Sequence, residues 1–200
     1  MALGDKDVRV RLQQSALNLF AERGYERTTA AEIAARAGVT ERTFFRHFPD
    51  KREVLFDGAA VLLSALTGFI ETAPDGLAPL DVLFFAFNAV VPLLEANRHI
   101  SHPRQEIIAA TPALAERELT KHAAMAHALA KLLQLRGVSH LPAELAGHTG
   151  MAAFAQATTA WLDDPAIALS ERLDLAYVGL KALWSAPTRA ADAQTSPEAG

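Results

Sequence analysis

Apolar residues recur every three to four positions along almost the whole chain, which is the period of an amphipathic α-helix. The N-terminal part shows this clearly, since Val8, Leu12, Ala16, Leu19 and Phe20 fall on one helical face. No run alternates polar and β-branched residues as a half-buried strand would. The pattern therefore predicts an all-α chain of about nine helices, the first over residues 6–23.

Capping residues and helix breakers predict where the next helices begin and end. The segment TAAE from Thr29 is a capping box, which starts a short second helix that ends before Gly38. Thr40 caps a third helix, and Pro49 stops it. Further helices are expected over residues 50–73, 79–97, 102–110, 111–136, 142–163 and 168–184, separated mainly by Pro and Gly.

The third helix combines aromatic and basic residues on opposite sides. At about 100° per residue, Phe44 and Phe48 lie about 40° apart, while Arg42 and Arg46 point the other way. Like charges one turn apart cost about 0.2–0.5 kcal/mol, so an anionic partner explains the arginine pair better than helix stability does. With the short helix before it and the turn at Gly38, this segment forms a helix-turn-helix, whose second helix is suited to the major groove of DNA.

Residues 28–56, TTAAEIAARAGVTERTFFRHFPDKREVLF, resemble the DNA-binding helix-turn-helix of the TetR family of transcriptional regulators. The resemblance implies an N-terminal three-helix DNA-binding domain, over residues 1–50, and a larger helical ligand-binding and dimerisation domain, over residues 51–184. Residues 185–200 are rich in Ala, Pro, Ser and Thr and are expected to be a disordered tail. The implied function is repression of transcription, relieved by a small molecule.

The resemblance also implies roles for individual residues in DNA binding. Four of them match positions that commonly meet DNA phosphates: Thr29, Thr43, His47 and Lys51. Thr40, Glu41 and Arg42 lie at the tip of the entering helix, and arginine can bind guanine with two hydrogen bonds, so Arg42 is the expected base-reading residue. Arg46 faces the same side. Phe45 replaces the tyrosine that is usual in the family and lacks a hydroxyl for a phosphate, although its ring can pack against sugar or a thymine methyl group.

Composition and charge narrow the classes of protein that fit. The chain has 200 residues and no cysteine, which excludes disulfides and thiolate sites, and a reducing cytoplasm is expected. The charged N-terminus does not resemble a secretory signal, and the most apolar run, residues 82–94, is shorter than a bilayer span, so no membrane partner is expected. Residues 1–56 carry a formal charge of +2 and residues 57–200 one of −6, which suits contact with a polyanion at one end.

The larger domain offers candidates for a ligand pocket. Large apolar residues with a few polar ones predict a site for an apolar small molecule among the helices over residues 79–97, 111–136 and 142–163. The expected lining residues are Phe84, Phe87, Asn88, His122, Met125, Phe154 and Trp161. Each has a plainer alternative, in which the aromatic residues fill a solid core, Asn88 bonds to a neighbouring helix or water, and Glu118 holds the ring of His122.

A stripe of small residues runs along the helix over residues 142–163. Its members are Ala146, Gly150, Ala153, Ala157 and Ala160. The stripe fits either a crowded core within one chain or, as the family resemblance favours, a homodimer interface completed by Leu173 and Leu180 of the last helix. A dimer would bind a palindromic operator in double-stranded DNA.

Enzymatic function finds little support in the sequence. There is no Gly-rich phosphate loop, no nucleophile motif and no metal quartet, and Glu-x-x-x-His alone is too weak a pattern for a metal site. No cofactor is expected. The alternative function is a helical small-molecule-binding protein with weak or lost DNA binding, because Phe45 replaces the family tyrosine.

Overall fold

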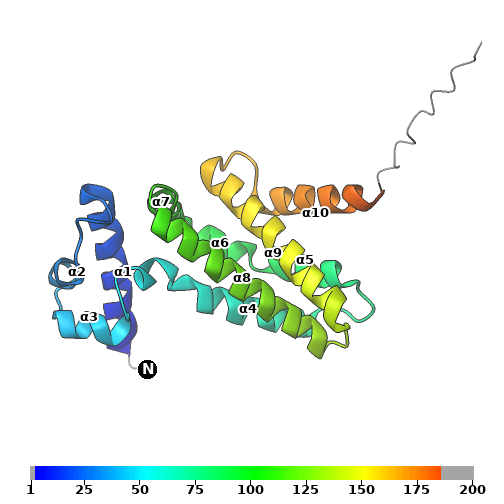
Figure 1. Ribbon diagram of the computed structural model, residues 1–200, viewed down its shortest axis with the longest axis horizontal. Helices are drawn as coiled ribbons and strands as arrows, with labels where there is room; N and C mark the ends of the chain where they lie inside the picture. Colours follow the sequence, from blue (N-terminus) through cyan, green and yellow to red (C-terminus); the bar gives the residue numbers. More distant parts are fainter. Residues whose placement is uncertain (1–2, 186–200) are drawn as a thin grey trace, which may run out of the picture.

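The computed structural model describes residues 3–185, and helices account for the regular structure of this range, without a strand (Figure 1). The all-α prediction is confirmed. In chain order the helices are α1 (Leu3–Arg23), α2 (Ala30–Arg36), α3 (Glu41–His47), α4 (Gly58–Thr72), α5 (Pro79–Ala89), α6 (Val91–Ala96), α7 (Arg98–Ala109), α8 (Pro112–Leu135), α9 (His140–Asp163) and α10 (Leu169–Ser185). The predicted tail lies outside the described residues, apart from Ser185 at the end of α10.

Two predicted helices are interrupted, each for a local reason. The helix expected over residues 50–73 begins instead as a turn and a 3-10 helix, Glu53–Phe56, before α4. Asp50 favours the turn because its carboxylate accepts hydrogen bonds from the backbone N–H groups of Arg52 and Glu53, at 2.8 and 3.1 Å. The helix expected over residues 79–97 is divided at Val90 into α5 and α6, since Pro92 has no N–H to continue the helical ladder.

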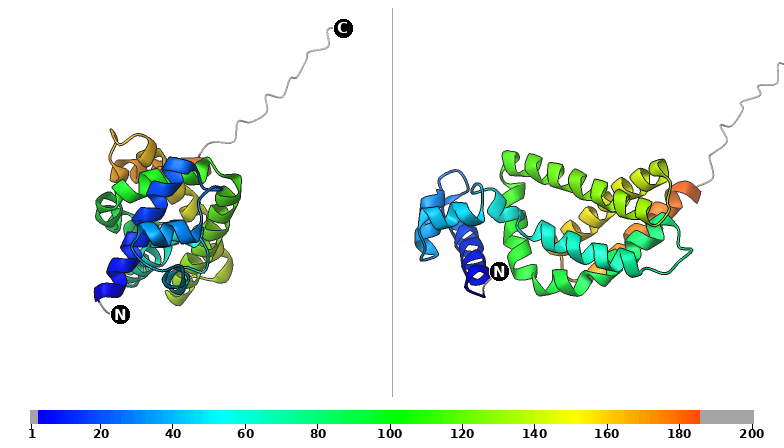
Figure 2. Two further views of the ribbon diagram at one scale, coloured as in Figure 1. Left: turned by 90° about the vertical axis from the view of Figure 1, so that its left-hand side faces the viewer. Right: turned by 90° about the horizontal axis from the view of Figure 1, so that it is seen from below.

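Helices α1, α2 and α3 form a small unit at one end of the molecule, and α4 to α10 form the larger body (Figures 1 and 2). The small unit is built on an apolar core, in which Phe44 and Phe48 of the predicted anchoring face are 0% and 1% exposed. Ile108 of α7 and Leu114 of α8 belong to the same core. Val54, Leu55 and Phe56 belong to the same core. The packed small unit therefore extends beyond residue 50, through the 3-10 helix.

The larger body is built around the antiparallel pair α8 and α9, with α5 and α10 against α9 and α4 against α8. Small residues allow the close approach of these helices. A Cβ atom at Gly147 would lie 2.6 Å from the backbone oxygen of Ala126 on α8, and one at Gly150 would lie 2.8 Å from Leu83 on α5. The aromatic rings of Phe87 and Phe154 meet at 4.6 Å in the centre of this core.

Two apolar segments, Glu53–Thr72 and Pro79–Ala96, are long enough to cross a membrane by length and composition alone, a property that core helices of soluble proteins share. The second segment contains the run that the sequence predicts to be a buried helix. Leu83 and Phe87 there are 0% exposed and pack within the larger core, which agrees with that prediction.

Candidate functional site

The turn between α2 and α3 is fixed by backbone hydrogen bonds and one glycine. Gly38 has φ of +70°, a conformation that other residues rarely adopt. Its N–H donates to the carbonyl of Ala35 at 3.1 Å, and that of Val39 donates to Ala34 at 3.0 Å, which is the pair of bonds of a Schellman helix end. The angle between the two helices therefore follows from local sequence.

The first turn of α3 is exposed and held in place by its cap. The side chain of Thr40 accepts a hydrogen bond from the backbone N–H of Thr43 at 3.2 Å, and the two hydroxyls are 3.0 Å apart. Glu41 and Arg42 are exposed, and Arg42 makes no ion pair with any residue in the described range. The predicted base-reading side chain is thus free to meet a partner.

The last turn of α3 is partly covered by the start of α1. Asp5 lies 3.7 Å from the guanidinium of Arg46 and 3.3 Å from Nε2 of His47. The side chain of His47 is only 5% exposed. Asp5 therefore offsets the repulsion between Arg42 and Arg46, a contact that sequence spacing does not reveal, and His47 would need a rearrangement at α1 to reach DNA.

Two further predicted DNA contacts are exposed. Thr29 caps α2 in the predicted capping box. The backbone N–H of Thr29 donates to the carboxylate of Glu32 at 2.9 Å, and the backbone N–H of Glu32 donates to the hydroxyl of Thr29 at 3.2 Å. Phe45 is 50% exposed, with its ring edge-on to Phe44 at 5.4 Å. An exposed phenyl ring at this place offers a surface for packing on sugar or a methyl group but no hydrogen bond.

Lys51 is occupied within the chain. Its ammonium donates to the backbone carbonyls of Tyr25 and Thr28, each at 2.9 Å, and to that of Glu26 at 3.4 Å. It also lies 4.2 Å from the centre of the Tyr25 ring. An ammonium has three donors, so these contacts use its capacity. In this structure Lys51 stabilises the loop between α1 and α2 by binding its backbone carbonyls, a role that was not predicted.

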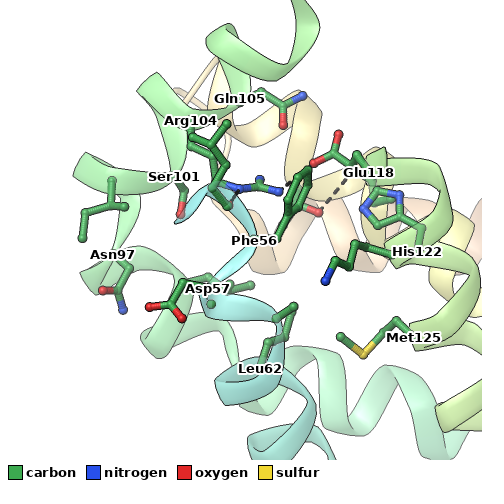
Figure 3. A pocket seen from close by; sticks show the side chains of 18 of the residues that line it. Phe56, Asp57, Leu62, Asn97, Ser101, Arg104, Gln105, Glu118, His122 and Met125 are labelled. Carbon is green, nitrogen blue, oxygen red and sulfur yellow. Dashed lines mark hydrogen bonds and ion pairs between the residues drawn. The ribbon is translucent and has the colours of Figure 1, made fainter. Parts of the chain in front are cut away.

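The larger body contains a cavity of about 370 Å³ between α4, α6, α7, α8 and α9, close to the small unit (Figure 3). Most of its wall is apolar, and polar side chains reach it from several elements, among them Asp57, Arg104 of α7 and Glu118 of α8. Its lining includes Leu55, Phe56, Asp57, Leu62, Leu94, Asn97, Ser101, Arg104, Gln105, Glu118, Lys121, His122, Met125, Met151, Phe154 and Thr158.

An arginine from α7 connects several groups of the cavity wall. Arg104 donates to Glu118 on α8 at 2.9 Å and to the backbone carbonyl of Leu55, and its guanidinium lies 5.3 Å from the centre of the Phe56 ring. Burial lowers the pKa of Arg104 from its usual value, against the opposing effect of Glu118. Burial also lowers the pKa of His122, so this imidazole favours its neutral form.

A second set of charges holds the 3-10 helix against α8. Glu53 accepts hydrogen bonds from Arg117 at 2.7 Å and from Lys121 at 2.8 Å. Burial alone would raise the pKa of Glu53, but these two bonds outweigh it and the pKa lies below its usual value. The segment that leaves the small unit is therefore anchored to the larger body by charged hydrogen bonds.

The predicted ligand residues divide into two groups. Three of them line the cavity: His122, Met125 and Phe154. The other four do not. Phe84 and Phe87 are 4% and 0% exposed in the solid core, Trp161 is 4% exposed, and Asn88 lies 3.5 Å from Asp174 on α10. Phe84 and Asn88 meet Tyr177 and Asp174 of α10, and Phe87 meets Phe154 of α9. Trp161 lies beside Arg98 of α7, so none of the four lines the cavity.

The small-residue stripe is largely inside the protomer, so the seam prediction does not fit these positions. Ala146, Gly150 and Ala157 are buried, and Gly150 contacts Leu83 and faces Phe87 of α5 in the same chain. Ala153 and Ala160 are half-buried. Of the two residues on α10, Leu173 is 0% exposed and Leu180 is partly buried against the same core. The crowded-core alternative accounts for the stripe.

Residues that the sequence did not single out complete the site. Arg104 and Asp57 are the clearest, since each joins elements that are distant along the chain. Asp57 accepts from Arg9 on α1, and Arg104 connects α7, α8 and the 3-10 helix. An isolated arginine or aspartate in a helical sequence carries no local signal of such a partner.

A seven-residue helix that follows a tight turn and exposes its first turn is the element with which helix-turn-helix proteins enter the major groove. The small unit is therefore of the helix-turn-helix DNA-binding class. Residues 13–57 match the family model of the bacterial regulatory proteins, tetR family. The helix-turn-helix unit of this chain is therefore of the TetR type.

Named relatives support this assignment over the small unit. The HTH-type transcriptional regulator TcmR of Streptomyces glaucescens is 41% identical over 83 residues, which are 42% of this chain and 37% of that protein. The HTH-type transcriptional repressor KstR2 of Mycolicibacterium smegmatis is 36% identical over 84 residues, 40% of this chain and 41% of that protein. These matches thus span less than half of the relatives' own lengths.

A solved structure is similar along nearly the whole chain. It is that of Thermus thermophilus FadR, a TetR-family transcriptional repressor, in complex with lauroyl-CoA. The similarity has a TM-score of 0.59 at 26% sequence identity and covers 96% of this chain and 100% of that one. The likeness therefore includes the larger body as well as the helix-turn-helix.

Proposed function

We propose that the protein is a cytoplasmic transcriptional repressor that binds operator DNA as a homodimer and is released by a predominantly apolar small molecule. One observation carries the regulatory part of this proposal. The cavity wall includes Leu55, Phe56, Asp57 and Gly58, the segment that joins the helix-turn-helix unit to α4. A ligand in the cavity would touch the only stretch of backbone that connects the DNA-binding unit to the larger body.

Contacts on both sides of this segment support transmission of a ligand signal. On one side Arg9 of α1 holds Asp57 through its carboxylate, and on the other Arg104 holds the carbonyl of Leu55. A ligand that displaces Arg104 or Phe56 changes the support of the 3-10 helix. Regulation requires only that the ligand binds the DNA-free arrangement more tightly than the DNA-bound one.

The size and chemistry of the cavity define the ligand class. A volume of about 370 Å³ is within the usual range for small-molecule sites. Leu62 and Met125 lie near each other on the cavity wall (Figure 3) and suit a hydrocarbon or aromatic body. Arg104 and Lys121, which also line the cavity, suit an acceptor or anionic group. Lauroyl-CoA, which the related FadR binds, has both features and is a reasonable first probe.

Dimerisation is proposed through the outer face of α10. Its residues Leu175, Val178 and Leu183 are 60%, 63% and 74% exposed, while the opposite face of α10 packs on α9 and α5. A second copy is the occupant that fits, because a palindromic operator presents two half-sites about 34–36 Å apart to two linked helix-turn-helix units. Replacing Val178 with Glu should give monomers in sedimentation velocity and weaken operator binding, whereas a dimeric Val178→Glu variant would exclude this face.

The proposal is tested by fluorescence anisotropy with DNA from the region upstream of the protein's own gene. The protein should bind one fragment saturably, and lauroyl-CoA or another apolar ligand found by thermal shift should release it. Absence of sequence-specific binding at low salt would favour the alternative, a small-molecule-binding protein without an operator.

A pair of variants on α8 ties release to the cavity. Met125→Trp fills the cavity and should abolish the ligand effect while leaving DNA binding intact. Leu119→Trp, at a 69% exposed position on the same helix, is the matched control and should retain both. Equal ligand responses in the two variants would place the ligand elsewhere.

A further inference from the structure

Two histidines and a glutamate form a cluster on the surface of the α8–α9 pair, separate from the cavity. Nδ1 of His127 on α8 is 2.9 Å from Oε2 of Glu144 on α9, and Nε2 of His148 is 3.7 Å from the same oxygen. Glu144 is 20% exposed, whereas the histidines are 64% and 53% exposed. The cluster thus presents three donor groups from two helices to solvent.

The spacing of the three donor atoms suits a small cation. All three lie within 4.8 Å of one another. In a tetrahedral zinc site, metal–ligand distances of about 2.0–2.2 Å place neighbouring donor atoms roughly 3.3–3.6 Å apart. The two observed separations, 2.9 and 3.7 Å, lie on either side of this value, so small side-chain rotations would form the site.

The arrangement exceeds what an ion pair requires. One histidine is enough to pair with Glu144. His127 and His148 nevertheless both turn to this carboxylate, with ring centres 5.7 Å apart. A divalent cation would use a nitrogen of both rings together with the carboxylate. His140, with Nδ1 4.0 Å from Oε1 of Glu144, lies just outside this triad.

We propose that His127, Glu144 and His148 form a binding site for a divalent transition metal ion, Zn²⁺ by the chemistry of the donors, with water in the fourth position. Imidazole and carboxylate ligands of this number suit Zn²⁺ and Co²⁺ and disfavour Mg²⁺, which prefers oxygen ligands. The ion would cross-link α8 to α9 near the turn that joins them. Binding would therefore stabilise the helical hairpin that forms one wall of the cavity.

The test uses the full chain, freed of metal with a chelator and titrated with ZnCl₂ in a calorimeter. One Zn²⁺ should bind per chain, and Co²⁺ should produce visible absorption bands that excess Zn²⁺ removes. His127→Ala and His148→Ala should each weaken Zn²⁺ binding by about tenfold or more. His99→Ala is the matched control, because His99 is an exposed histidine on α7 outside the cluster, and this variant should bind as the original chain does.

A second measurement separates a built site from scattered surface histidines. Zn²⁺ should raise the thermal midpoint of the original chain and of His99→Ala but leave that of the His127→Ala/His148→Ala double variant unchanged. Circular dichroism of the metal-free double variant should match the original, since both side chains are exposed. Equal Zn²⁺ affinity in the original and double variant, or no binding to either, would overturn the proposal. Operator binding is not involved, so the result is independent of the proposed function.

Discussion

The guanidinium of Arg9 on α1 forms an ion pair with the carboxylate of Asp57, the residue just before α4. Its Nε donates hydrogen bonds to the two carboxylate oxygens at 2.8 and 2.9 Å. The same guanidinium donates to the backbone carbonyl of His47 at the end of α3 and lies 4.7 Å from the centre of the Phe48 ring. The hydrogen bond that Arg9 donates to Asp57 is the main reason that the pKa of Arg9 is raised. One ion pair thus joins the first helix, the recognition helix and the cavity wall.

Replacing Asp57 with Asn should uncouple the small unit from the cavity. Loss of the charged hydrogen bonds should lower the free energy of unfolding by about 1–3 kcal/mol, measured by urea denaturation. The ratio of operator affinities with and without ligand, measured by anisotropy, should move towards one. Glu22→Gln, which removes an exposed ion pair with Arg36, is the control and should leave both quantities unchanged. A full ligand response in Asp57→Asn would exclude this ion pair from the regulatory path.

Replacing Arg42 with Ala should affect recognition of one base pair. Its exposed guanidinium has no partner in the described part of the chain, so its loss should cost roughly 1–3 kcal/mol at one operator position and relax base preference there. Competition with operators carrying single base changes measures this. Lys131→Ala, an equal change of charge on the distant α8, controls for long-range electrostatics. A uniform loss across all operators would identify a phosphate contact instead.

Replacing Lys51 with Met tests two roles against each other. The structure predicts loss of stability, about 1–3 kcal/mol, because the carbonyls of Tyr25 and Thr28 lose a charged donor. Urea denaturation gives this quantity. The sequence alone predicts a phosphate contact, for which stability would be unchanged while the salt dependence of DNA binding would decrease by about one unit. That second pattern would contradict the structural role.

Gly147 and Gly68 should respond to alanine in opposite directions. A Cβ atom at Gly147 would lie 2.6 Å from a backbone oxygen of α8, which cannot yield as a side chain can, so Gly147→Ala should destabilise the chain by about 1–3 kcal/mol. No atom lies within 4 Å of the Cβ position at Gly68 in α4, and Gly68→Ala should stabilise the helix by about 0.5–1 kcal/mol. Thermal and urea unfolding of both variants provide the measurement. Similar effects in the two would show that α8 and α9 are less tightly packed than described.

Stability should decrease as the pH falls below about 6.5, in part because of His122. Burial lowers the pKa of His122 in the folded chain, so below the pKa of the unfolded chain the unfolded state binds more protons than the folded state. The stabilisation is therefore complete above about pH 6.5 and is lost as the pH falls through the folded pKa. His122→Gln should show a shallower decrease in unfolding free energy between about pH 7.5 and 5.5. Parallel pH profiles of the two proteins would rule out this contribution.

The sequence determined the helical class and the local geometry of the helix-turn-helix. The cap at Thr29, the cap at Thr40 and the turn at Gly38 each depend on residues within five positions, so their signals are complete in a short segment. The anchoring role of Phe44 and Phe48 follows from helical spacing alone. These features were predicted because the interactions that create them are local.

Only the tertiary structure decided which helix faces meet. Periodicity shows that Phe87 and Met125 are apolar and inward-facing, but not that the first fills a core and the second lines a cavity. It likewise gives no sign that Lys51 binds the carbonyl of Tyr25, or that Gly150 packs on α5 and not on a second copy. Such contacts join residues 26 to 67 positions apart, and their free energy depends on how the helices pack, which the spacing of residues along one helix does not specify.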